Sequence, residues 1–85
     1  MILHAEQIRA ARSLLGWSQA DLAKYAKLGS MTVRRFEAGS GPVRGTIESL
    51  VRVQSTLERE GIKFIDADEF GSVGVRLVQK PKAKK

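Results

Sequence analysis

Arg34 and Arg35 are the residues whose type and position point most directly to a partner molecule. They stand together near the end of the run LGWSQADLAKYAKLGSMTVRRFEAG, residues 15–39, in which the spacing of apolar residues indicates two short helices joined by a tight turn. The second helix begins with small or flexible residues and then presents the two guanidinium groups. This arrangement is expected of a helix that enters a DNA groove.

Catalytic and metal-binding chemistry is not indicated. His4 is the only histidine and the chain has no cysteine, so we expect His4 to be a surface residue and not a metal ligand or catalytic base. Ser18 and Ser30 have no base nearby in the sequence and are interpreted as a helix cap and a contact residue. The sequence therefore predicts a protein that is not an enzyme and that uses no metal or other cofactor.

The charge of the chain favours a polyanionic partner. Fifteen Lys and Arg residues outnumber nine Asp and Glu residues, which gives a net charge of +6 and an isoelectric point near 10.2. The charge is uneven, because residues 1–45 carry +4, residues 46–70 carry −3 and residues 71–85 carry +5. Nucleic acid is the partner we expect first and a membrane surface the second. We expect residues 1–45 to carry the binding surface.

Length and composition indicate one small globular domain. The 85 residues are 42% hydrophobic and 28% charged, an ordinary balance for a folded chain. Without cysteine, stability must come from packing and not from disulfides. The start of the chain has no apolar signal core, and no stretch reaches the roughly 20 apolar residues that span a bilayer. We expect a cytoplasmic protein without a membrane partner.

Short helices must position the arginines, and the sequence predicts where these helices begin and end. Residues 6–15 have apolar side chains at helical spacing, and Gly16 ends this first helix. Ser18 is expected to cap the second helix, where Asp21 suits the positive helix start. On its inner side the second helix is expected to bury Leu22, Ala23 and Ala26.

The next two helices follow from the same signals. The third helix ends near Gly39, and residues 40–45 form a loop by composition. Thr46 is expected to cap a fourth helix, which Gly61 ends. On its inner side the fourth helix is expected to place Ile47, Leu50, Val51 and Leu57.

Beyond Gly61 the pattern becomes extended. Residues 62–66 and 73–78 flank an acidic connection, which predicts a β-hairpin. An isolated hairpin is marginal in water, so it must pack on the helices or pair with another chain. The expected organisation is a DNA-binding domain over residues 1–61, a hairpin over residues 62–79 that could serve dimerisation, and a solvated basic tail over residues 80–85.

Three residues sit where a helix-turn-helix needs a small crossing residue, an apolar turn residue and an apolar anchor, namely Ala23, Leu28 and Val33. Through LGWSQADLA, Leu28 and VRRFEAG, the chain resembles the XRE family, the Cro and lambda-repressor-like helix-turn-helix proteins. The resemblance covers about residues 6–58. It implies a mainly α, lambda-repressor-like four-helix DNA-binding domain, here followed by the hairpin.

The resemblance also implies roles for individual residues on double-stranded DNA, with the second helix of the motif in the major groove. Arg35 is expected to make a bidentate contact to guanine and Met31 to touch a thymine methyl group. The implied base contacts are Ser30, Met31 and Arg35. The implied phosphate contacts are Gln19, Thr32, Arg34 and Arg44.

Two further features follow from the comparison with this family. Arg12 and Glu37 match positions that pair an arginine with a glutamate, so we expect a structural ion pair. Lys27 stands where glycine is usual, and Gly29 stands where a capping Ser or Thr is common. Either Lys27 takes a left-handed conformation at a cost of roughly 1 kcal/mol, or the turn is rearranged and residues 30–32 shift by one position.

The leading hypothesis is a small bacterial or prophage-type transcriptional regulator, a repressor that binds a palindromic operator as a homodimer. Candidate interface residues on the hairpin are Phe64, Ile65, Val75 and Leu77, with Val53 and Leu57 of the fourth helix as the alternative. Two other functions stay open. The chain could be an antitoxin that neutralises a toxin protein and represses its own operon, or a protein-interaction adaptor that no longer reads DNA.

Overall fold

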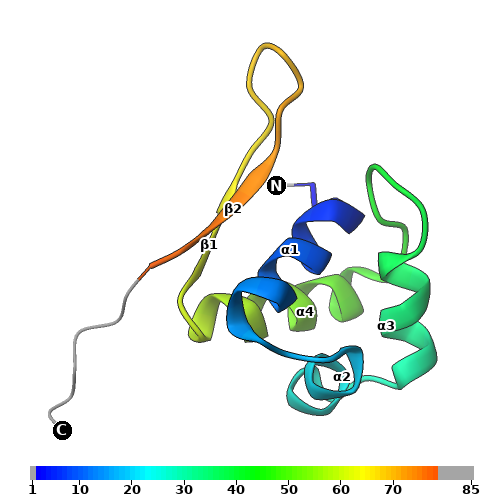
Figure 1. Ribbon diagram of the computed structural model, residues 1–85. Coiled ribbons are helices and arrows are strands. Elements are labelled where there is room, and N and C mark those ends of the chain that lie inside the picture. Colours follow the sequence, from blue (N-terminus) through cyan, green and yellow to red (C-terminus); the bar gives the residue numbers. More distant parts are fainter. Residues whose placement is uncertain (1, 79–85) are drawn as a thin grey trace, which may run out of the picture.

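The chain folds into four helices followed by a two-stranded antiparallel hairpin in a computed structural model, which describes residues 2–78 (Figure 1). In chain order the elements are α1 (Ala5–Leu15), α2 (Gln19–Ala26), α3 (Ser30–Glu37), α4 (Ile47–Arg59), β1 (Ile62–Ile65) and β2 (Gly74–Leu77). The predicted order of helices and hairpin is confirmed for these residues. The predicted tail, residues 80–85, and the last position of the predicted hairpin segment, Gln79, lie outside them.

Local side-chain chemistry starts and ends the helices where the sequence predicts. The Ser18 hydroxyl accepts from the Asp21 N–H at 3.0 Å, and the Asp21 carboxylate accepts from the Ser18 N–H at 2.9 Å, so α2 has a reciprocal cap. At the start of α4, the Thr46 hydroxyl accepts from the Ser49 N–H at 3.1 Å. Gly16 ends α1 in the left-handed region, with φ of 71°.

The turn between α2 and α3 keeps the expected register. Lys27 adopts the left-handed conformation, with φ of 59°, and is the one non-glycine residue with positive φ in the described chain. Leu28 N–H donates to the Ala23 carbonyl at 2.9 Å and closes the end of α2. With Gly29 at the N-cap, α3 begins at Ser30. The left-handed conformation of Lys27 is therefore observed, and α3 begins directly after Gly29.

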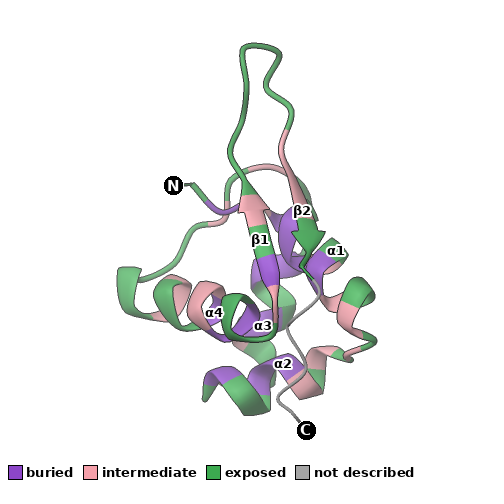
Figure 2. Cartoon of the chain, turned by 90° about the vertical axis from the view of Figure 1, so that its left-hand side faces the viewer, coloured by how far each residue is buried: buried purple, intermediate pink, exposed green. Residues whose placement is uncertain are grey.

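The core lies where α1, α2, α3 and α4 meet beneath the hairpin (Figure 2). Ala23 and Val33 are buried, and Leu28 packs against the core, as the helix-turn-helix pattern predicts. Trp17 is half-buried against the same core, and its ring lies 4.9 Å from that of Tyr25 between centroids. The buried apolar residues are Leu3, Ile8, Ala11, Leu22, Ala23, Ala26, Val33, Phe36, Val53, Leu57 and Ile62.

The inner face of α4 differs from the predicted one. Ile47 is 80% exposed and Val51 is 53% exposed, so the prediction that they face the core is wrong. Positions 50, 53 and 57, spaced by three and four residues, form the inner stripe instead. Val53 and Leu57 are completely buried, and this corrects their choice as an interface surface, because they offer no exposed atoms to a second chain.

The hairpin packs on the helices and is fastened to α1 by one buried side chain. Gln7 is 1% exposed, and its Nε2 donates to the Ile65 carbonyl at 3.0 Å and to the Gly74 carbonyl at 2.9 Å. These two residues face each other across the strands. Phe64 and Val75, also cross-strand neighbours, pack against the core. The first alternative for the hairpin, packing on the helices, is confirmed.

The outer parts of the hairpin remain accessible. Of the predicted interface residues, Ile65 is 39% exposed and Leu77 is 43% exposed, whereas Phe64 and Val75 are partly covered by the core. Beyond the strands, the connection projects from the body of the molecule (Figure 1). Its tip is ordered by the Asp68 carboxylate, which accepts from two backbone N–H groups, and these bonds lower the pKa of Asp68.

Candidate nucleic-acid interface

The two faces of α3 have opposite character. Val33, Phe36 and Glu37 are buried. Met31 is two thirds exposed and shares the outer face with polar and charged side chains, namely Ser30, Arg34 and Arg35. The Phe36 ring lies so close to Gly45 that a Cβ on this glycine would stand 2.6 Å from a ring carbon. Close packing of this kind leaves α3 little freedom to rotate about its own axis. The exposed face is therefore presented in a fixed orientation.

The structure brings most of the predicted DNA-contacting side chains together on this outer face. Met31, Arg34 and Arg35 line one shallow hollow, in which Arg34 Nη1 lies 3.8 Å from Met31 Sδ. Thr32 and Arg35 border a second hollow together with Arg44. Arg35 is shared by both hollows, so it lies between the two groups. Ser30 is exposed at the start of the same helix.

The three arginines on this surface carry charge that no carboxylate among residues 2–78 neutralises. Arg34, Arg35 and Arg44 are exposed, and none of them forms an ion pair within residues 2–78. The first turn of α3 contains no acidic residue. A phosphate group approaching this side would therefore meet unpaired guanidinium groups.

Gln19 is placed differently from the other predicted phosphate contacts. It is half-buried at the first position of α2, and its Nε2 donates to Glu37 Oε1 at 3.1 Å. A side-chain amide has two N–H donors, so this bond leaves a second N–H for a phosphate. Gln19 is thus part of the framework that holds α3 as well as a candidate contact.

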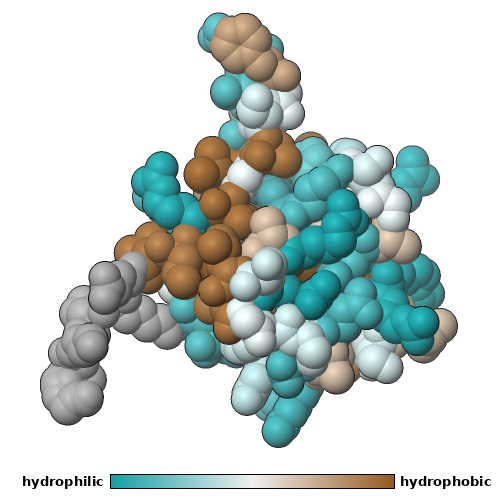
Figure 3. Space-filling view, viewed as in Figure 1, coloured by the Kyte–Doolittle hydropathy of each residue, from teal (hydrophilic) through white to brown (hydrophobic). Residues whose placement is uncertain are grey.

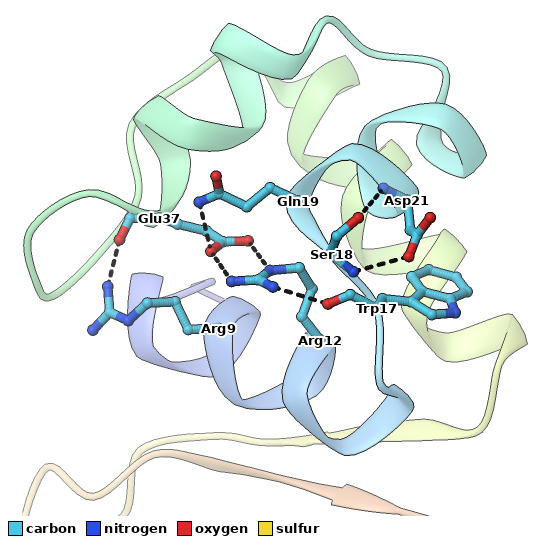
Figure 4. A network of polar contacts seen from close by, with 7 residues as sticks. All are labelled: Arg9, Arg12, Trp17, Ser18, Gln19, Asp21 and Glu37. Carbon is cyan, nitrogen blue, oxygen red and sulfur yellow. Dashed lines mark hydrogen bonds and ion pairs between the residues drawn. The ribbon is translucent and has the colours of Figure 1, made fainter.

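The predicted pair of Arg12 and Glu37 is confirmed and lies at the centre of a polar network (Figure 4). Arg12 Nε and Nη2 donate to the two Glu37 carboxylate oxygens at 2.7 Å and 2.8 Å. A third donor of Arg12, Nη1, reaches the Trp17 carbonyl at 2.9 Å. The hydrogen bond to Glu37 raises the pKa of Arg12, although burial of the guanidinium opposes the shift. A bidentate pair of this kind fixes direction as well as distance.

A second set of contacts fixes the loop that follows α3. Arg9 Nη1 donates to the Glu37 carbonyl and, at 2.9 Å, to the Gly39 carbonyl. The Glu6 carboxylate accepts from the Gly41 N–H at 3.0 Å, and this bond lowers the pKa of Glu6. Sequence reasoning did not identify Glu6 or Arg9. Glu6, Arg9 and Arg12 follow one another at intervals of three residues, which places neighbouring members on one side of a helix, and this spacing is the signal that could have found them.

Other kinds of site are not indicated in the part of the chain that the structure describes. Among residues 2–78, no three His, Cys, Asp or Glu side chains gather as they would around a metal ion. Within the same residues, no helix has the length and apolar character needed to cross a bilayer.

Comparison with known proteins adds one relative. The chain is 33% identical over 69 residues to a protein of Archaeoglobus fulgidus described as a "putative HTH-type transcriptional regulatory protein". The match covers 78% of this chain and 22% of the relative, so the chain spans about a fifth of the length of the curated relative it matches. No family model matches the chain, and no solved structure matches it. The similarity is therefore to one part of that regulatory protein.

Proposed function

We propose that this chain is a transcriptional regulator of the XRE family, with a lambda-repressor-like fold, that binds double-stranded DNA through α3. Two independent observations support the proposal. One is the geometry of α2, its tight turn and α3, in which the turn and crossing residues pack as a helix-turn-helix requires. The other is the similarity to the helix-turn-helix regulatory protein of Archaeoglobus fulgidus.

In the proposed complex, α3 lies in the major groove and α2 crosses the phosphate backbone. Arg35 donates two hydrogen bonds to O6 and N7 of a guanine, and Met31 contacts a thymine methyl group. Ser30 reaches a base edge from the first turn of α3. The phosphates are bound by Gln19, Thr32, Arg34 and Arg44.

The observation that carries this proposal is the contrast between the two faces of α3. Its inner face is held by the bidentate pair of Arg12 and Glu37, while its outer face presents arginines that have no carboxylate partner within residues 2–78. A braced helix with a cationic outer face is suited to a polyanion with a groove of matching width. An adaptor for a protein partner without an acidic surface would have no need for this free positive charge.

We propose further that the active form is a homodimer that represses transcription by occupying a two-fold-symmetric operator. Helix-turn-helix dimers place their recognition helices on half-sites about one helical turn apart, and the symmetry of the operator follows that of the protein. A single short helix contacts few base pairs, so pairing also supplies the specificity that one copy lacks.

Selection of bound sequences from a random pool of duplex DNA tests the proposed function. The expected result is one enriched motif with two-fold symmetry, containing a guanine in each half-site. Binding to random duplex should fall steeply as salt rises, because phosphate contacts release counterions. Recovery of no motif, together with salt-independent binding, would contradict DNA reading by α3.

Toxin neutralisation is a second candidate function, favoured by the tip of the hairpin. Phe70 is 82% exposed there, although the backbone around it is ordered by Asp68. An exposed aromatic residue on an ordered turn is a suitable anchor for a protein partner. Co-expression with the proteins encoded next to its gene tests this: rescue of growth by the wild-type chain, and loss of rescue with Phe70→Ala, would identify an antitoxin.

A further inference from the structure

An apolar patch on the outer side of α4 has no partner within the described chain. Its exposed members are Ile2, Ile47 and Val51, which are 65%, 80% and 53% exposed. They line one hollow, whose other apolar walls are Leu3, Val43 and Leu50. We refer to Ile2, Ile47 and Val51 as the α4 patch.

The α4 patch is preformed. The segment before α1 is held beside the loop that follows α3, because Val43 N–H donates to the Leu3 carbonyl at 2.8 Å and Ala5 N–H donates to the Gly41 carbonyl at 2.9 Å. Ile2 is therefore kept next to the start of α4. A surface that is already ordered loses less conformational entropy when a partner binds.

The charges beside the α4 patch are arranged so that the surface complements itself. Glu48 directly follows Ile47, and Arg52 directly follows Val51. Glu48 and Arg52 form an ion pair of 2.8 Å within α4. Both side chains remain well exposed, at 76% and 43%. When two copies of α4 meet antiparallel about a two-fold axis, Ile47 of one copy approaches Val51 of the other. The same operation brings Glu48 of each copy towards Arg52 of the other.

We propose that a second copy of this chain docks on the α4 patch, so that two antiparallel α4 helices form the dimer interface. This inference rests on the proposed function in that it supplies the pairing that a two-fold operator needs. The start of α4 stands at an edge of the molecule away from the hairpin (Figure 2). It is also tied to α3 through the contact of Phe36 with Gly45, so a rigid pairing of α4 helices fixes the separation of the two α3 helices.

The hairpin offers a competing apolar surface, but its charges oppose self-pairing. Apolar side chains gather over the hairpin (Figure 3), among which Leu77 and Val78 are 43% and 47% exposed. Lys63 and Arg76 are directly opposite each other on the two strands and both are exposed. A two-fold pairing of hairpins would add a second pair of like charges to this one, which is unfavourable.

The expected dimer is weak in free solution. Three exposed side chains cannot cover the roughly 800 Å² per partner that a standard stable interface buries. We therefore expect a concentration-dependent equilibrium between monomer and dimer, and pairing that is completed when two copies occupy adjacent half-sites. Binding to a full operator should be cooperative, whereas binding to an isolated half-site should not depend on the α4 patch.

The first test compares the double variant Ile47→Asp/Val51→Asp with the matched control Leu77→Asp by sedimentation equilibrium. The α4 variant should be monomeric at all concentrations, and the control should dimerise as the wild type does. Both should bind a half-site duplex equally, which separates failure of this inference from failure of DNA binding. Loss of dimer in the control with retention in the α4 variant would overturn the proposal.

The second test uses the charges to show that the contact is between copies. Glu48→Arg alone and Arg52→Glu alone should each weaken dimerisation by about tenfold, because like charges then face each other twice per dimer. An equimolar mixture of the two variants should recover wild-type dimerisation, since both cross-contacts become attractive again. The ion pair within each helix stays broken in the mixture, so absence of recovery would mean that the charges act within one chain only and would overturn the proposal.

Discussion

The helix α3, which we propose reads DNA, and the hairpin are both fastened to α1, but by different chemistry. Arg12 holds Glu37 of α3 through a bidentate ion pair between side chains. Gln7 holds the hairpin through two neutral hydrogen bonds to main-chain carbonyls, those of Ile65 and Gly74. An ion pair with one nearly buried partner is costly to break from one side, whereas neutral bonds are weaker. We therefore expect α3 to be held more rigidly than the hairpin.

Breaking the ion pair should have the largest effect. Glu37→Ala leaves the partly buried guanidinium of Arg12 without its carboxylate partner, and we expect a loss of about 3 kcal/mol in the free energy of unfolding. Urea denaturation followed by circular dichroism measures this value. The double variant Arg12→Met/Glu37→Met should recover part of the stability, because no unpaired charge remains. A double variant less stable than Glu37→Ala would contradict this account of the network.

Removing the hairpin fastening should have a smaller and more local effect. Gln7→Leu keeps roughly the volume but removes both hydrogen bonds to the part-buried Ile65 and Gly74 carbonyls, at a cost of about 2 kcal/mol. Hydrogen exchange should show faster exchange of the amides between β1 and β2, with protection in α2 and α3 unchanged. Gln54→Leu on α4 is the control, and equal acceleration in both variants would show that Gln7 has no special role.

A substitution in the turn between α2 and α3 should stabilise the fold, whereas the two substitutions above destabilise it. Lys27 is left-handed, a conformation that glycine adopts without strain. Lys27→Gly should therefore stabilise the chain by up to about 1 kcal/mol, measured by thermal unfolding. The same substitution at Lys24, inside α2, is the control and should destabilise it. Destabilisation by Lys27→Gly would indicate that the lysine side chain makes a contact worth more than the strain.

The smallest expected effect is an acid-dependent loosening of the loop after α3. The pKa of Glu6 in the folded chain lies below its ordinary value of 4.5, chiefly because its carboxylate accepts from the Gly41 N–H. A lowered pKa means that this contact stabilises the fold above about pH 4.5 and is lost as the pH falls through the lowered value. The Gly41 amide resonance should follow this titration by NMR, and a midpoint above 4.5 would contradict the contact.

The sequence predicts the elements that depend on local chemistry. Ser18 and Thr46 predict the starts of α2 and α4, because a cap is a hydrogen bond between residues that are close in the sequence. The pair of Arg12 and Glu37 was reached through family resemblance, since nothing local in the sequence joins positions 25 residues apart. Gln7 could not be predicted, because its partners are main-chain carbonyls, which every residue has.

The inner face of α4 shows a second limit of sequence reasoning. Ile47 and Val51 fit an apolar stripe at helical spacing as well as Val53 and Leu57 do, yet only the latter two are buried. Spacing reveals which apolar residues share a face but not where that face ends. On α4, Leu50, Val53 and Leu57 face the core, whereas Ile47 and Val51 lie on the outer side.

The most direct test of DNA reading by α3 is a comparison of Arg35→Ala with Arg76→Ala on the duplex obtained by selection. Each variant is titrated against that duplex and against one in which the half-site guanines are replaced by adenines. We predict that Arg35→Ala, with its fold intact by circular dichroism, lowers the preference for the selected duplex by about tenfold or more. Arg76→Ala, on the hairpin, should keep the wild-type preference. Full retention of the preference by folded Arg35→Ala would contradict the claim that α3 reads the bases through Arg35.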